Sequence, residues 1–121
     1  MRALIQRVSS ASVSAEHNVT QHIDKGYVIF LGVGPEDNEE IAKSLWAKIS
    51  KLRIFEDEQG KTNLSIHDVE GSILLVSQFT LYADCRRGNR PSFTKAAKPE
   101  QAEALYTYFG SLIQQDSIEL K

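Results

Sequence analysis

Two nearly unbroken apolar segments place the strongest limit on what this chain can fold into. Residues 27–33 read Tyr-Val-Ile-Phe-Leu-Gly-Val, and residues 73–76 read Ile-Leu-Leu-Val. Strands that are apolar on both faces are typical of a sheet that is covered on both sides. The sequence therefore predicts that both segments are interior strands of one domain, residues 1–121, which is long enough to have a core of its own.

Further strands complete the predicted sheet. Alternation or β-rich composition predicts strands at 3–8, 19–23 and 73–81, and a short extended piece at 53–55. Gly26 can adopt a positive φ in the loop between residues 23 and 27, so segments 19–23 and 27–33 are predicted to form a hairpin. Residues 117–121 alternate like the beginning of a strand, and a frayed tail is the equal alternative.

Two amphipathic helices are predicted to cover this sheet. The first begins at Asp37, an N-cap with Glu40 three residues later, and its apolar stripe is Ile41, Leu45, Ile49 and Leu52. The second begins at Pro99, and its apolar stripe is Ala102, Leu105, Tyr106, Phe109, Leu112 and Ile113. The predicted class is α+β, with a largely antiparallel, barrel-like sheet.

Composition disfavours several classes of function. Cys85 is the only cysteine, and three scattered histidines form no cluster at metal-ligand spacing. The first residues lack the apolar stretch of a signal peptide, and no segment approaches the roughly 18 apolar residues of a membrane span. We therefore expect a soluble, cytoplasmic protein with no membrane contact and no metal. Its net charge of −2 gives no overall attraction to nucleic acid, so a basic surface must be local.

The end of the predicted strand 73–81 is the first candidate site. As a continuing strand it would place Gln78 and Thr80 on one face and Ser77 and Phe79 on the other. A polar group at the end of a buried strand costs about 1–3 kcal/mol if it finds no hydrogen-bond partner. Neighbouring backbone alone can provide that partner, so these residue types leave both a structural and a functional role open.

A basic loop follows this segment. Residues 84–98 carry five basic side chains and one acidic side chain, whereas residues 36–58 carry seven acidic and four basic ones. A local excess of positive charge on a loop is suited to contact a phosphate backbone. A solvated surface loop explains the same composition, and so does turn chemistry for Gly88 and Pro91.

Standard catalytic arrangements are weakly represented. His17, His22 and His67 lie far in sequence from Ser77 and Thr80, and none has the sequence context of a catalytic triad. Cys85 follows the candidate strand, but no base that could activate its thiol is near in sequence. Trp46, within the first predicted helix, is expected to pack in the core.

Five motifs, spread in order along almost the whole chain, resemble those of D-aminoacyl-tRNA deacylases. They are Met-Arg-Ala-Leu-Ile-Gln-Arg-Val at 1–8, Leu-Gly-Val-Gly at 31–34, Leu-Arg-Ile-Phe at 52–55, Ser-Gln-Phe-Thr-Leu-Tyr at 77–82 and Gly-Asn-Arg-Pro-Ser-Phe at 88–93. The Ser-Gln-Phe-Thr-Leu block is the most specific of them. The resemblance implies hydrolysis of the ester of D-aminoacyl-tRNA, without metal or organic cofactor. It also implies a homodimer with its sites at the subunit interface.

The same resemblance implies a role for individual residues of the pocket. Gln78 and Phe79 would line it and supply backbone donors to the oxyanion, while the ribose hydroxyl of the substrate helps to activate water. Ser77 would hold this geometry. Thr80 would be a site residue, and the threonine at this place in the family has been considered a possible nucleophile. Arg7, in the first strand, would support the pocket. The charges facing tRNA would be Arg86, Arg87 and Arg90.

One departure from the family pattern concerns the end of the sequence. The family rejects L-amino acids with a Gly-Pro dipeptide from the partner subunit, located in a C-terminal strand region beyond residue 121. Gly34-Pro35 is not that element, because it precedes the first predicted helix. We therefore expect the sequence to be a shortened form of a longer protein, with C-terminal strands missing.

Two other functions compete with ester hydrolysis of charged tRNA. A non-catalytic nucleic-acid-binding module would use the basic loop at residues 86–98 and show salt-dependent binding without turnover. A small-molecule esterase would cleave simple aryl esters without RNA. Both remain open at the level of the sequence.

Overall fold

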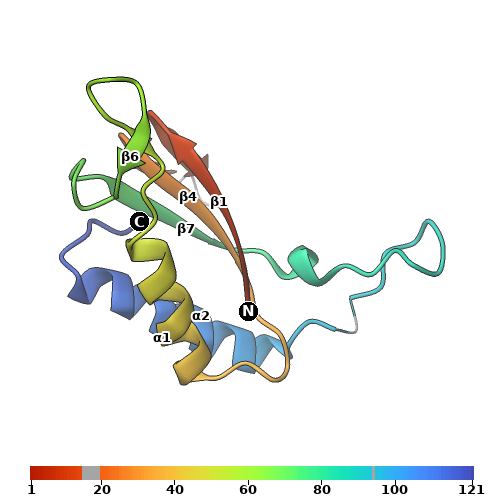
Figure 1. The fold of residues 1–121 in the computed structure, drawn as a ribbon. Helices are drawn as coiled ribbons and strands as arrows, with labels where there is room; N and C mark the ends of the chain where they lie inside the picture. The colour runs from red at the N-terminus through yellow and green to blue at the C-terminus, as the bar shows by residue number, and fades with distance from the viewer. Residues whose placement is uncertain (15–19, 94) are drawn as a thin grey trace.

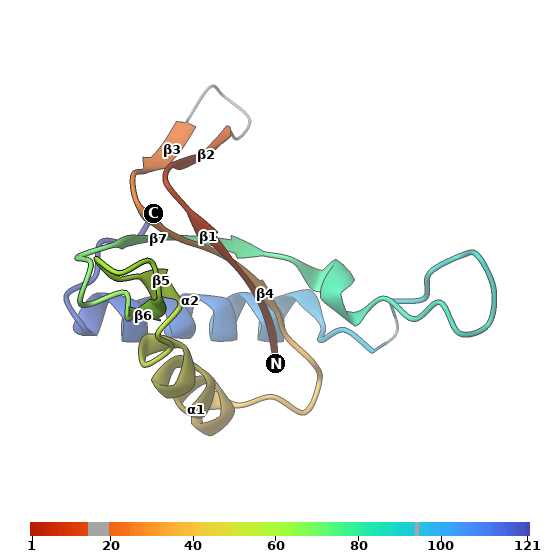
Figure 2. The same cartoon turned by 45° about the horizontal axis from the view of Figure 1, so that its top comes forward.

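A three-stranded sheet and two helices make up the body of the protein. The computed structural model describes residues 1–14, 20–93 and 95–121. Strands β1 (Arg2–Val8), β4 (Gly26–Gly32) and β7 (Ser72–Ser77) form the sheet, and helices α1 (Glu39–Ser50) and α2 (Pro99–Gln115) lie together on one face of it (Figures 1 and 2). This confirms an α+β domain with two helices, whereas closure into a barrel remains a prediction.

The order of strands in this sheet is β1-β4-β7. β1 pairs antiparallel with β4, but β7 pairs parallel with β4, so the prediction of a largely antiparallel sheet is wrong for the side that carries the candidate site. The connection from β4 to β7 passes through α1, as a parallel pair requires a long crossover. β4 is buried along nearly its whole length, which confirms the prediction for segment 27–33.

The predicted hairpin of segments 19–23 and 27–33 is wrong. Strand β3 (Thr20–Ile23) pairs with β2 (Ala11–Ser14), and β4 pairs with β1. Both pairings belong to one continuous antiparallel register, because the residue numbers of any two opposite residues add up to the same value in both. Residues 2–14 and 20–32 are therefore two arms of one long antiparallel hairpin. The loop at Gly26 is therefore a bend in one arm. Figure 2 shows β2 and β3 leaning away from the main sheet beyond this bend.

Residues 118–121 lie along β7, after Ser117, which has a φ of 61° and belongs to the turn that follows α2. The amide of Ile73 donates to the Glu119 carbonyl oxygen at 2.9 Å, and the amide of Lys121 donates to the Ile73 carbonyl oxygen at 3.0 Å. Leu120 pairs with Ile73 in parallel orientation, and Ile118 is buried. The strand-like alternative is confirmed for residues 118–121 and is wrong for Ser117.

Helix α1 begins one residue later than predicted. Asn38 is the N-cap, and its side-chain oxygen accepts from the Ile41 amide at 3.0 Å. Asp37 cannot take this role because its carboxylate accepts from the Gly34 amide at 2.7 Å and lies 2.6 Å from the Met1 amino group. The buried face is Ala42, Trp46 and Ile49, whereas Ile41 is exposed, so the predicted stripe is rotated by about one residue.

Helix α2 begins with Pro99 in its first turn, as predicted. It buries Leu105, Phe109 and Ile113 against the sheet and α1. Trp46 meets Phe109 edge-on with ring centroids 6.0 Å apart, which confirms a packing role for Trp46. Strands β5 (Phe55–Glu56) and β6 (Thr62–Leu64) form a small antiparallel pair above the helices.

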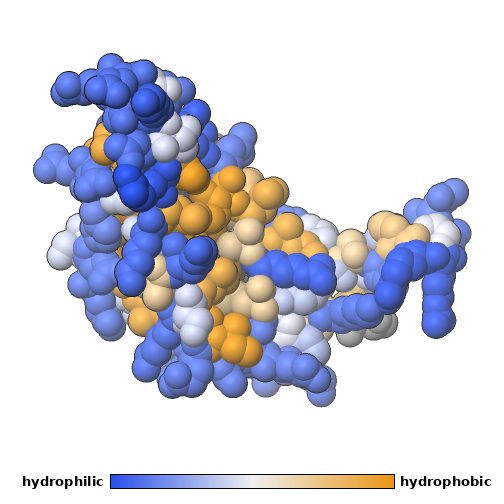
Figure 3. Space-filling view, in the orientation of Figure 1, coloured by the Kyte–Doolittle hydropathy of each residue, from blue (hydrophilic) through white to orange (hydrophobic). Residues whose placement is uncertain are grey.

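The surface of the body is partly apolar. In the space-filling view, apolar side chains gather over the middle of the body, and the projecting loop is mostly hydrophilic (Figure 3). Among the described residues, no helix is both long and apolar enough to cross a membrane.

Candidate functional site

Strand β7 ends at Ser77, four residues earlier than predicted. A short 3₁₀ helix, η2 (Phe79–Tyr82), follows, so the predicted alternation of side chains beyond Ser77 is wrong. The Gln78 amide makes the last ladder hydrogen bond, to the Leu31 carbonyl oxygen at 2.8 Å. Next to it, a Cβ on Gly32 would lie only 3.0–3.2 Å from atoms of Gln78, Leu81 and Tyr82. The absence of a side chain there lets η2 pack on the end of β4.

The first turn of η2 presents two backbone donors. A 3₁₀ helix offers no acceptor of its own to its first amides, and those of Phe79 and Thr80 donate to no backbone carbonyl elsewhere in the described chain. Both residues are exposed. The Gln78 amide is engaged with Leu31. The pair available as donors is therefore Phe79 and Thr80, instead of the predicted Gln78 and Phe79.

A cavity of about 480 Å³ opens beside these donors. It lies between the start of η2, the chain just before α2, and α2 itself, and is lined by Ser77, Phe79, Phe93, Ala96, Ala97, Pro99, Ala102, Glu103 and Tyr106. The rings of Phe79 and Phe93 meet edge-on with centroids 5.1 Å apart. Phe79 is 56% exposed, so much of its ring is free to contact a ligand.

The walls of this cavity offer few ionisable groups. Tyr106 donates its hydroxyl to the Leu75 carbonyl oxygen at 2.8 Å, and burial raises the pKa of Tyr106. Glu103 is exposed. The sequence did not identify Tyr106 as a residue of this cavity, because its spacing matches the apolar stripe of α2. Phe93 was not identified either, but its place in the family motif at 88–93 was a signal that could have found it.

Thr80 has no base at its side chain. Its hydroxyl accepts a hydrogen bond from the Gln78 side-chain amide, and an amide cannot remove a proton from it. Within the described residues, no histidine or carboxylate is hydrogen-bonded to this hydroxyl. The arrangement stabilises the position of the two side chains and gives no means of activating a nucleophile.

The structure does not bring Arg7 to this cavity. Arg7 lies opposite Tyr27, whereas Ser77 lies opposite Leu31, four residues further along β4 and so roughly 13 Å away. The Arg7 guanidinium donates to the Ile54 carbonyl oxygen at 2.6 Å and lines a separate cavity. Within one chain, the predicted support of the pocket by Arg7 is therefore absent.

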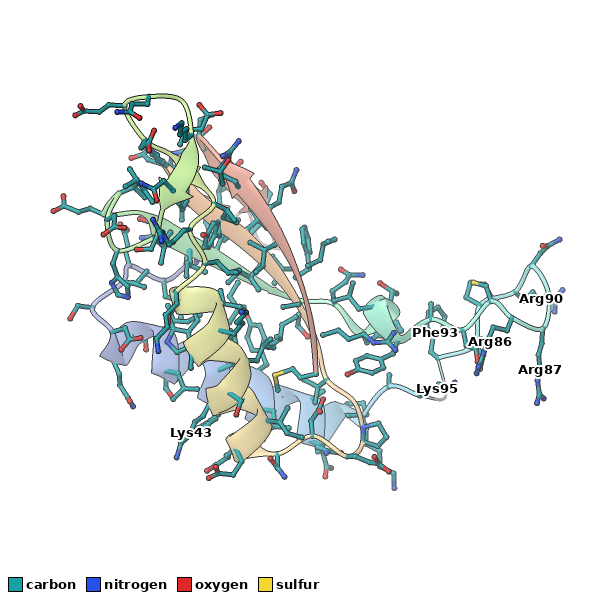
Figure 4. All side chains as sticks on the ribbon, in the orientation of Figure 1. Lys43, Arg86, Arg87, Arg90, Phe93 and Lys95 are labelled. Atoms are coloured by element: carbon teal, nitrogen blue, oxygen red, sulfur yellow. The ribbon has the colours of Figure 1, made fainter. Side chains whose placement is uncertain are left out.

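The basic loop projects from the body behind a closed neck. Asp84 and Ser92 exchange two backbone hydrogen bonds of 2.7 and 2.8 Å. The Asp84 carboxylate accepts from the Arg86 guanidinium at 2.8 and 2.9 Å, and Arg86 holds the pKa of this carboxyl well below its usual range. Arg87 and Arg90 point outward from the far end of the loop (Figure 4).

This neck divides the three predicted arginines into two kinds. Arg86 is tied to Asp84 on the neck, so part of its charge is already neutralised. Arg87 and Arg90 are exposed, and among the described residues neither takes part in an ion pair with a carboxylate. Between the two sides of the neck, the positive charge without a carboxylate partner among the described residues is therefore that of Arg87 and Arg90.

The remaining candidates lie apart from the cavity. His22 is exposed and pairs with Asp24 at 3.1 Å, His67 is exposed, and His17 lies outside the described residues. Cys85 is an exposed free thiol at the base of the loop. No three His, Cys, Asp or Glu side chains are grouped as metal ligands within the described part of the chain.

The chain is similar to known proteins over nearly its whole length. The family model described as D-Tyr-tRNA(Tyr) deacylase matches residues 4–121. The D-aminoacyl-tRNA deacylase of Thermotoga petrophila is 51% identical over 121 residues, which are 100% of this chain and 81% of that protein. The enzyme of the same name from Bacillus pumilus is also 51% identical over 121 residues and is covered to 82%.

Solved structures share the fold. The structure of a c-Myc DNA unwinding element binding protein matches with a TM-score of 0.89 at 36% identity, covering 99% of this chain and 83% of that one. The structure of a probable eukaryotic D-amino acid tRNA deacylase matches with a TM-score of 0.82 at 15% identity, covering 93% of this chain and 66% of that one. At that low identity the second match supports the fold alone.

Proposed function

Since the chain belongs to the D-Tyr-tRNA(Tyr) deacylase family, we propose that it hydrolyses the ester of D-aminoacyl-tRNA to the free D-amino acid and tRNA. The observation that carries the proposal is the pair of unengaged amides at Phe79 and Thr80, next to an aromatic cavity. Together they provide backbone donors where an ester carbonyl can be placed. This is the chemistry expected of a hydrolase without a side-chain nucleophile.

In the proposed reaction, water adds to the ester carbonyl carbon. The negative charge that forms on the carbonyl oxygen is stabilised by the amides of Phe79 and Thr80, each of which contributes about 2.7–4 kcal/mol in comparable sites. The neighbouring hydroxyl of the terminal ribose helps to remove a proton from the attacking water. The bond to the ribose oxygen then breaks, and this oxygen takes up a proton, which leaves tRNA and a free amino acid.

The cavity is proposed to receive the 3′ end of the charged tRNA. Its volume of about 480 Å³ lies within the usual range for a small-ligand site. Phe79 and Phe93 offer ring faces and edges to a base or an apolar side chain. Arg87 and Arg90 would contact the phosphate backbone, and Arg86 would contribute less because Asp84 already binds it.

We further propose that the protein acts as a homodimer in the cytoplasm. The face of the sheet opposite α1 and α2 holds a shallow apolar cavity of about 380 Å³, lined by residues that include Val8, Phe30 and Val76. An exposed apolar surface of this kind is suited to an interface with another copy. Light scattering should give twice the mass of one chain, and a monomer at micromolar concentration would contradict this assembly.

The direct test is the release of D-tyrosine from D-tyrosyl-tRNA by the purified protein with a metal chelator present. We expect release well above spontaneous hydrolysis, and L-tyrosyl-tRNA assayed in parallel measures chiral selectivity separately. Salt-dependent retention of tRNA without release would favour the nucleic-acid-binding module instead. Cleavage of simple aryl esters at a rate unaffected by competing tRNA would favour the small-molecule esterase.

Thr80→Ala separates the backbone mechanism from nucleophilic catalysis. The substitution keeps the backbone amide and removes the hydroxyl, so we expect kcat within about threefold of the unsubstituted protein. A loss of about a thousandfold or more, the size expected when a true nucleophile is removed, would assign the hydroxyl a chemical role and contradict the mechanism proposed here.

A further inference from the structure

Tyr82, the last residue of η2, is held by side chains from two distant segments. The Arg2 guanidinium lies 4.4 Å from the centroid of the Tyr82 ring. The Asp37 carboxylate lies 3.5 Å from the Tyr82 hydroxyl. Burial, together with this carboxylate, raises the pKa of Tyr82. The ring is therefore fixed between a cation and an anion.

Arg2 makes a second contact with the same turn. Its Nη1 atom donates to the Leu81 carbonyl oxygen at 2.7 Å. One planar guanidinium thus binds the backbone of Leu81 and covers the ring of Tyr82 at the same time, a combination for which arginine is well suited. Arg2 lies in β1, so this contact ties the start of that strand to the end of η2.

The Asp37 carboxylate is itself held in position by other contacts. Its two carboxylate oxygens accept from the Gly34 amide at 2.7 Å and contact the Met1 amino group at 2.6 Å, and its side chain is only 8% exposed. Gly34 itself leaves room for the ring, because a Cβ at this position would lie 3.1–3.2 Å from atoms of Tyr82. The surroundings of Tyr82 therefore allow it little freedom to move.

The helix needs this external support because it is short. η2 comprises four residues, and helices of this length and type are weakly stabilised by their own hydrogen bonds. A change in the position of Tyr82 would rotate the first turn, where the unengaged amides of Phe79 and Thr80 lie. A displacement of about 1 Å is enough to weaken alignment with a developing oxyanion.

We propose that Arg2 and Tyr82 form a clamp that positions the η2 amides for the reaction, so that both are positioning residues. The inference rests on the proposed function, since its effect on rate requires a carbonyl bound at these amides. It assigns a role to Arg2, which does not line the cavity beside Phe79.

The test compares Arg2→Ala and Arg2→Lys with a matched control, Arg53→Ala. Arg53 is also exposed and also donates to a backbone carbonyl, that of Asn63 in β6 at 2.8 Å. We expect kcat for D-tyrosyl-tRNA to fall about tenfold in Arg2→Ala while KM changes less than about twofold. Arg2→Lys should recover only part of this loss, because an ammonium cannot bind Leu81 and cover the ring together.

Hydrogen exchange provides a readout that does not depend on catalysis. In Arg2→Ala, amides of the peptide covering residues 78–83 should exchange faster, while those of β4 remain protected, and Arg53→Ala should change neither. Tyr82→Leu, which removes the ring at similar bulk, should reproduce the effect on kcat and on exchange. This second variant separates the clamp from any direct contact of Arg2 with RNA.

The outcomes distinguish the clamp from the proposed function. Wild-type kcat in Arg2→Ala, a rise in KM alone, or unchanged exchange at residues 78–83 would overturn the clamp while leaving the hydrolase intact. If the unsubstituted protein releases no D-tyrosine, the proposed function fails instead. Exchange then decides the structural half of the inference, and unchanged protection in both Arg2→Ala and Tyr82→Leu overturns it.

Discussion

Replacing Phe79 by proline removes one of the two proposed oxyanion donors and is compatible with the backbone conformation at this position. Phe79 is the first residue of η2, a position that tolerates the fixed φ of proline. A residue that precedes proline avoids the helical region of φ and ψ, and Gln78, with φ −141° and ψ 84°, lies outside that region. The substitution also removes the aromatic ring, so Phe79→Ala is the necessary reference.

The expected magnitudes separate the two effects. Phe79→Ala loses the edge-on contact with Phe93, which is worth about 0.5–1.5 kcal/mol, or roughly a twofold to tenfold change. Phe79→Pro additionally loses the N–H donor, for which about 2.7–4 kcal/mol is expected, or roughly 10²–10³ in kcat. Single-turnover release of D-tyrosine from saturating protein measures the rate constant of the chemical step without interference from tRNA binding or product release.

Equal rates for Phe79→Pro and Phe79→Ala would refute the assignment of the Phe79 amide as a donor. Hydrogen exchange of β7 checks that the proline variant keeps its fold. A chemically closer comparison places the α-hydroxy analogue of phenylalanine at position 79 by in vitro translation, which replaces N–H by oxygen and keeps the ring. We expect the same loss as the difference between proline and alanine.

Two further predictions concern RNA binding and stability. Replacing Arg87 and Arg90 together by Gln should raise KM. It should also lower the slope of log KM against log salt concentration by about 2, because each lost phosphate contact lowers this slope by about 1. Arg86→Gln should change the slope less, because Asp84 already binds Arg86. An equal effect of Arg86→Gln would contradict the role of the neck. Tyr27→Phe should raise the free energy of unfolding in urea by about 1 kcal/mol, because the buried hydroxyl has no partner among the described residues. Tyr106→Phe should lower it by about 1 kcal/mol, since it leaves the Leu75 carbonyl without its donor, and a change of the same sign in both variants would refute this reasoning.

Local sequence patterns correctly predicted which segments are buried. They failed where contacts with residues distant in sequence determine strand pairing or the start of a helix. The burial of segment 27–33 follows from its side chains alone. The bend at Gly26 has the composition of a hairpin turn, but the pairing of β3 is set by a register that runs through β2 and β1. At the start of α1, Asp37 and Asn38 are both suitable caps, and contacts of Asp37 with Gly34 and Met1 decide between them.

The candidate site shows the same division. The Ser77 to Tyr82 segment was identified, and Ser77 and Phe79 line the cavity. Its alternation continues past Ser77 like that of a strand, yet the strand stops because Gly32 on β4 admits a helical turn. Which amide is without a backbone partner depends on that stop, so the sequence alone could not show that the Gln78 amide is engaged with Leu31 and that Thr80 is the better proposal for the second donor.

The cavity and the basic loop belong to one structural unit. η2 ends at Tyr82, the neck closes between Asp84 and Ser92, and the returning chain places Phe93 against Phe79. One wall of the cavity therefore forms only when the neck is closed. Arg87 and Arg90 lie beyond the same neck, so the proposed contact of the loop tip with RNA would depend on the same hydrogen bonds as this wall of the cavity. In the proposed function, about a dozen consecutive residues would thereby couple binding of the tRNA backbone to placement of its charged end, and the basic side chains of this loop would give a chain of net charge −2 a local surface for RNA.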